Sequence, residues 1–65
     1  MIIINGEPSD LAPGATLSEL LDHLGAPDRG VAVAVDAEVV PRGAWGTFAL
    51  ADGARVEVLT AVQGG

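Results

Sequence analysis

The chain has 65 residues, no cysteine, one histidine and a net charge of −6, from nine acidic residues and three arginines. This length fits one domain, and the lack of thiols excludes disulfides and cysteine-ligated metal sites. The scarcity of basic residues argues against nucleic-acid binding, because phosphate contacts need clustered Lys and Arg. We expect a protein that binds neither metal nor nucleic acid and that meets a basic partner surface.

No basic leader precedes the first apolar run, and no apolar stretch approaches the roughly 20 residues that span a membrane. We therefore expect a cytoplasmic protein with no membrane partner. The chain also contains no lysine. Its side chains therefore cannot accept an isopeptide bond, although the chain can still act as an acyl donor.

Residues 1–4 form a β-branched run, and Asn5-Gly6 follows as the strongest two-residue hairpin signal. Residues 7–11 are predicted to return as a second strand. Pro8 has no N–H to donate, so it places that strand at the edge of a sheet.

The clearest local signal predicts a helix. Thr16 and Glu19 have the spacing of a capping box, and Gly25 suits the left-handed position that ends a helix. Four leucines recur at the spacing of one helical face: Leu17, Leu20, Leu21 and Leu24. His23 lies off this stripe with no nucleophile or carboxylate at a defined spacing. We interpret it as a solvated side chain and predict no catalytic residue.

Residues 31–35 alternate valine with alanine, which indicates a strand that is buried on both faces or has a thinly covered alanine face. A turn and a short strand over residues 38–40 follow. Residues 41–46 are predicted to form a loop or a single helical turn. Trp45 within it is expected to cap one end of the core with its N–H near the surface.

Residues 47–50 are ambiguous, with Phe48 or Leu50 turned inward, and Asp52-Gly53 predicts a turn. The longest strand then covers residues 55–62. Its alternation predicts four core-facing residues, Val56, Val58, Thr60 and Val62. The other face would carry Arg55, Glu57, Leu59 and Ala61.

The order of elements predicts an α+β fold, the β-grasp, with a mixed sheet and one main helix packed across one face. The first and last strands would lie parallel at the sheet centre. Residues 1–62 would form the domain and residues 63–65 a flexible tail ending in Gly64-Gly65. Glycine has no Cβ, so such an end fits a narrow channel, where its carboxylate suits activation and attack by a sulfur or nitrogen nucleophile.

The sequence resembles the ubiquitin-like sulfur carriers, most closely the ThiS-type carriers of thiamine biosynthesis. The resemblance rests on the start Met-Ile-Ile-Ile-Asn-Gly, on Val-Pro-Arg followed by Trp45, on Asp52-Gly53 and on the terminal Gly64-Gly65. It implies a protein substrate that is not itself an enzyme and binds no cofactor. A ubiquitin-activating-like adenylyltransferase would use ATP to adenylate Gly65. A cysteine desulfurase would supply sulfur, and thiazole synthase would consume the thiocarboxylate.

Arg42 and Trp45 match the motif and are interpreted as structural. A docking surface for these partners is hypothesised near the tail, made of Leu59, Ala61, Val62 and Gln63. Three other interpretations remain open: a sulfur carrier for molybdopterin or cysteine synthesis, a ubiquitin-like protein modifier, and a regulatory domain whose Gly-Gly end is incidental.

Overall fold

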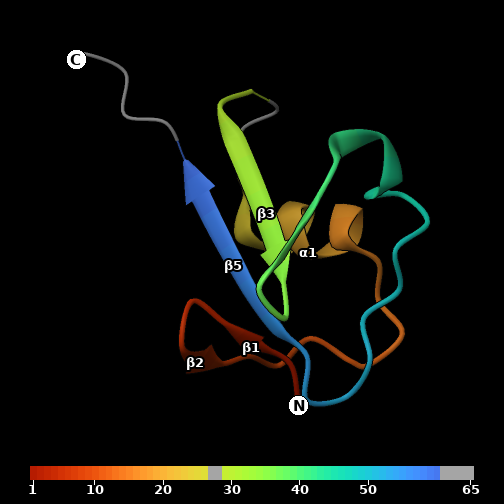
Figure 1. Cartoon of the computed structure of the whole chain (residues 1–65). Helices are drawn as coiled ribbons and strands as arrows, with labels where there is room; N and C mark the ends of the chain where they lie inside the picture. Colours follow the sequence, from red (N-terminus) through yellow and green to blue (C-terminus); the bar gives the residue numbers. More distant parts are fainter. Residues whose placement is uncertain (27–28, 61–65) are drawn as a thin grey trace.

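The computed structural model describes residues 1–26 and 29–60. These residues form a five-stranded sheet with one α-helix on one of its faces (Figure 1). The strands are β1 (Ile3–Ile4), β2 (Glu7–Pro8), β3 (Val31–Val35), β4 (Glu38–Val40) and β5 (Arg55–Thr60). The helix α1 spans Leu17–Leu24, and a 3₁₀ turn, η1, spans Arg42–Ala44. The predicted mixed sheet with one helix across it is confirmed.

Strand β5 lies at the centre of the sheet, whose order is β2-β1-β5-β3-β4. It runs parallel to β1 and antiparallel to β3. The sequence predicted this parallel pairing of the first and last strands. Strand β2 is an edge strand, as Pro8 indicated, but it is shorter than predicted and ends at that proline.

The helix begins and ends where its capping residues predicted. The Glu19 N–H donates to Thr16 Oγ1 (3.2 Å), and the Thr16 N–H donates to Glu19 Oε1 (2.9 Å). Gly25 ends the helix in the left-handed conformation, with φ of 68°. These bonds satisfy N–H groups that have no partner inside the helix.

The core lies between α1 and the sheet. Of the predicted leucine stripe, Leu17, Leu20 and Leu21 are buried, but Leu24 is 44% exposed. Leu24 is the last residue of the helix and lies at the rim of the core, beside the β1–β2 hairpin.

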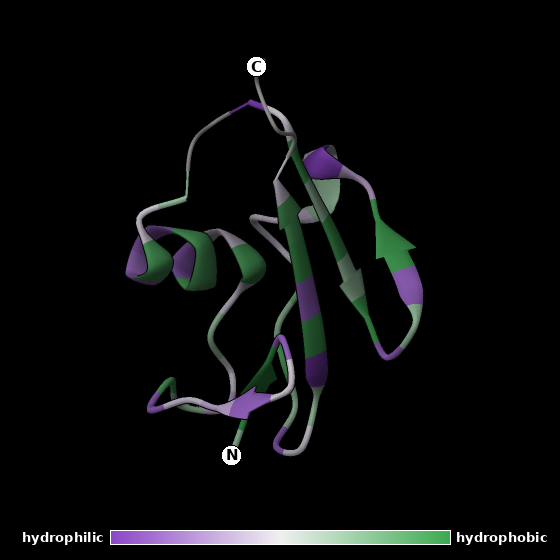
Figure 2. Ribbon diagram, turned by 90° about the vertical axis from the view of Figure 1, so that its left-hand side faces the viewer, coloured by the Kyte–Doolittle hydropathy of each residue, from purple (hydrophilic) through white to green (hydrophobic). Residues whose placement is uncertain are grey.

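The core-facing side chains of β5 become less buried toward its carboxyl end. Val56 is buried, Val58 is half-buried, and Thr60 is exposed, although the alternation along the strand is as predicted (Figure 2). Thr60 was therefore wrongly assigned to the core. The helix crosses the strands at a large angle instead of running along them (Figure 1), so it covers only part of β5.

Trp45 is buried, and its indole N–H donates to the Val40 carbonyl (2.9 Å). The expectation that this N–H lies near the surface was wrong, because the chain between these two residues turns back through η1 and brings a carbonyl to it. Leu50 is buried and Phe48 half-buried. On β3, Val33 and Val35 are buried whereas Ala32 is exposed, so the thinly covered alanine face is the correct alternative.

Candidate functional site

The candidate site is the carboxyl end of β5, where the chain leads into its last five residues. Leu59 is the one predicted site residue that lies within the described ranges. The others, Ala61, Val62, Gln63, Gly64 and Gly65, lie outside the described residues. The predicted division into a domain of residues 1–62 and a tail of residues 63–65 therefore stays a prediction.

Strand β3 pairs with most of β5, whereas β1 pairs only with its first two residues. On one side, residues 56–60 pair with β3, from Val35↔Val56 to Val31↔Thr60. On the other side, the parallel ladder to β1 covers only Ile3↔Arg55 and Ile4↔Val56. The carboxyl half of β5 therefore extends past the end of β1.

Leu59 is 65% exposed on the face of the sheet that α1 does not cover. It lies opposite Ala32 of β3, whose neighbour on the same face, Ala34, lies opposite Val39 of β4. Val39 is 77% exposed. We call Ala32, Ala34, Val39 and Leu59 the apolar face. Exposed apolar side chains that gather on one face suit contact with a protein partner.

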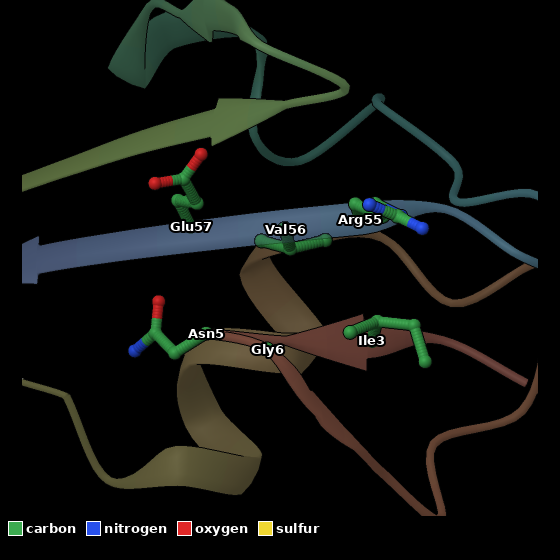
Figure 3. A pocket seen from close by; sticks show the side chains of 6 residues that line it. All are labelled: Ile3, Asn5, Gly6, Arg55, Val56 and Glu57. Atoms are coloured by element: carbon green, nitrogen blue, oxygen red, sulfur yellow. The ribbon is translucent and has the colours of Figure 1, made fainter.

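A pocket lies beside the apolar face, over β1 and the first half of β5 (Figure 3). It is lined by Ile3, Asn5, Gly6, Arg55, Val56 and Glu57. The helix passes behind these strands, so the pocket opens on the opposite side of the sheet (Figure 3). Its lining has two charged side chains of opposite sign and no nucleophile, which gives no basis for catalysis there.

The remaining polar candidates do not gather into a site. His23 is exposed on α1. Within residues 1–26 and 29–60, no group of three or more metal-binding side chains lies close enough to hold an ion. In the same ranges, no helix is long and apolar enough to cross a membrane. Arg42 is exposed whereas Trp45 is buried, so only the tryptophan has the packing that a structural role needs.

Sequence reasoning missed one residue near the site. Asn5 was assigned only to the β1–β2 turn, where it has a positive φ of 50°. Its side chain also hydrogen-bonds to the backbone of Val58, in the middle of β5. No local pattern predicts this contact, because the two residues are 53 positions apart.

The geometry defines a class of protein. A mixed sheet with a parallel central pair and one helix across a face is the ubiquitin-like β-grasp arrangement. The ThiS family model matches residues 2–65, and the chain belongs to this family.

Individual relatives agree with this placement. The chain is 40% identical over 65 residues to the sulfur carrier protein ThiS of Thermus thermophilus, with all of both chains covered. The crystal structure of a thiamine biosynthesis protein (ThiS) from Geobacter metallireducens superimposes with a TM-score of 0.80 at 34% identity, covering 98% of this chain and 97% of that one. This match confirms the β-grasp fold.

A third relative has a different architecture. The chain is 34% identical over 64 residues to a thiazole synthase of Paramagnetospirillum magneticum. The match covers 98% of this chain but only 20% of that protein. A region similar to this chain therefore occurs within a thiazole synthase polypeptide.

Proposed function

We propose that the protein is a sulfur carrier of thiamine biosynthesis, whose Gly65 carboxylate is converted to a thiocarboxylate that a thiazole synthase consumes. The observation that best supports this function is the extent of the family match, which runs through Gly64 and Gly65. The relatives from T. thermophilus and G. metallireducens bear names that refer to sulfur carriage and to thiamine biosynthesis.

The chemistry begins with a poor electrophile, the terminal carboxylate. An activating adenylyltransferase would transfer AMP from ATP to Gly65 and release pyrophosphate. The persulfide of a cysteine desulfurase would then attack the acyl carbon, so that a C–S bond forms and the bond to AMP breaks. A second thiol would cleave the resulting acyl disulfide and leave the thiocarboxylate. The protein would thus be a co-substrate that binds no cofactor of its own.

Two properties of the chain suit this role. Glycine has no side chain beyond its hydrogen, so Gly64 and Gly65 would fit a narrow channel to a nucleotide. The absence of lysine means that no side-chain amine of the carrier competes for its own activated end. Neither property distinguishes thiamine biosynthesis from another sulfur-transfer pathway; the relatives favour thiamine.

The apolar face is the surface we propose for partner docking, together with Ala61, Val62 and Gln63 of the following segment. Leu59 would be its central contact, because it is exposed and directly precedes Thr60, where β5 ends. The net charge of −6 would steer the carrier toward a basic partner surface. The thiazole synthase that contains a region similar to this chain supports such an enzyme as one partner.

The decisive measurement is the intact mass after incubation with ATP, a sulfide source and the candidate adenylyltransferase. We expect one oxygen to be replaced by one sulfur. The matched control lacks Gly65 and should keep the wild-type circular dichroism spectrum while gaining no sulfur. A wild-type mass that never changes, with no adenylate trapped, would contradict the function. Thiazole formation by a thiazole synthase supplied with the thiocarboxylate form then tests the pathway.

The docking surface is tested by a matched pair of substitutions. Leu59→Gln should raise the KM of the adenylation reaction for the carrier by at least about fivefold, as expected for truncating a central interface residue. Leu24→Gln changes another exposed leucine, on α1, and should leave the KM unchanged. Equal effects of both substitutions would argue against the apolar face as the docking surface.

A further inference from the structure

Strand β1 ends at Ile4, which pairs with Val56 of β5. Strand β5 continues to Thr60 and so extends past the end of β1. The backbone N–H groups of Ile3 and Asn5 donate to the carbonyls of Ala54 (2.9 Å) and Val56 (2.8 Å). Asn5 and Gly6 then take positive φ angles of 50° and 82°, and the chain turns away into β2. The next residue of β5 on this edge, Val58, thus lies beyond the backbone of β1.

The side chain of Asn5 takes the place of the missing backbone. The Val58 N–H donates to Asn5 Oδ1 (2.8 Å), and Asn5 Nδ2 donates to the Val58 carbonyl (3.3 Å). A carboxamide offers the same acceptor and donor as a peptide group, so one side chain satisfies both backbone groups of Val58. The side chain points toward β5 beside the pocket (Figure 3).

This contact matters because of its place along β5. Alternate residues of a strand direct their backbone groups to opposite neighbours. The Arg55 carbonyl accepts a hydrogen bond from the N–H of Asp36, just after β3 (2.8 Å). The backbone groups that bond toward β1 and Asn5 belong instead to Ala54, Val56 and Val58. Val58 lies two residues before Thr60, where β5 ends. Without Asn5, the strand beyond Val56 would be held from the β3 side alone and would open more readily.

We propose that Asn5 is a positioning residue for activation of the carboxyl terminus: its carboxamide holds the carboxyl half of β5, from which the chain continues to Gly65, on the side that β1 does not reach. This role rests on the proposed function, in which the segment after Thr60 must reach a nucleotide in a partner enzyme. Holding the reacting group in a defined geometry lowers the cost of bringing it into the partner's site. A role in the turn alone would need only the positive φ, which glycine also provides.

The test replaces Asn5 with glycine, which keeps the turn conformation and removes the carboxamide. We expect the Val58 amide hydrogen to exchange roughly five- to tenfold faster, in line with the loss of its hydrogen bond, while the Val56 amide changes little. We also expect the KM for adenylation to rise several-fold with kcat retained. The Asn5→Asp variant keeps the side-chain shape and the acceptor but loses the donor, and should show a smaller change of the same kind.

The matched control is Asp36→Gly. Asp36 has a positive φ of 49° in the other hairpin turn, and its Oδ1 accepts a bond from the Arg55 N–H (3.1 Å). This substitution removes an equivalent contact at the start of β5 and should leave the KM unchanged. If Asn5→Gly gains sulfur with the wild-type KM, or if both glycine variants raise the KM equally, the positioning role is wrong. A wild type that is never adenylated would instead overturn the proposed function, and this role with it.

Discussion

Replacing Ala37 with glycine is expected to stabilise the protein, although it removes a methyl group. Asp36 and Ala37 form the two-residue turn between β3 and β4, closed by the pair Val35↔Glu38, with φ of 49° and 72°. Such turns require positive φ at both positions and favour Asp-Gly. An L-residue in this conformation costs about 1–2 kcal/mol, which glycine avoids. Because Ala37 is exposed, its methyl group contributes little packing in return.

Glycine also loses more entropy on folding, about 0.4–1 kcal/mol. With the midpoints of these two ranges, the net gain is about 0.8 kcal/mol, which corresponds to a rise of about 3–6 °C in the melting temperature of a domain this small. Thermal unfolding followed by circular dichroism measures it. Ala51→Gly is the control, because Ala51 is an exposed turn residue without positive φ, and there the substitution should destabilise. A melting temperature that falls equally in both variants would refute the argument from backbone strain.

Three further predictions concern the core and the helix cap. Trp45→Phe should lower stability by about 1–3 kcal/mol, because the Val40 carbonyl loses its buried donor; an unchanged urea midpoint by circular dichroism would show that this bond is unimportant. Leu20→Ala, at a fully buried site, should cost about 2–5 kcal/mol, whereas Leu24→Ala should cost under about 1 kcal/mol; similar losses would contradict the described core. Thr16→Ala should cost about 1 kcal/mol and Thr16→Ser much less, and equal losses would exclude the capping bond as the cause.

The sequence predicted the parts of the fold that depend on local spacing. The capping box at Thr16 and Glu19, the left-handed Gly25 and the Asn5-Gly6 hairpin each require only a few neighbouring residues. The parallel pairing of the first and last strands followed from their high β propensity and from the order of elements, which leaves few alternatives.

Long-range geometry explains what the sequence did not predict. The exposure of Thr60 and Leu24 depends on which part of the sheet α1 covers, and the periodicity of the sequence does not specify this. The partner of the Trp45 indole depends on the path of η1. The bonds from Asn5 to Val58 depend on the register between β1 and β5, and a polar residue in a turn gives no sign of such a role.

The parallel arrangement of β1 and β5 has a practical consequence for following this protein in solution. The amino group of Met1 pairs with Asp52, at the end of the sheet where β5 begins, whereas Thr60 lies at the other end (Figure 1). Since the chain has no lysine, an amine-reactive dye would attach only at Met1. A single fluorophore would then report every partner encounter by anisotropy, from a position about the length of β5 away from the end that reacts.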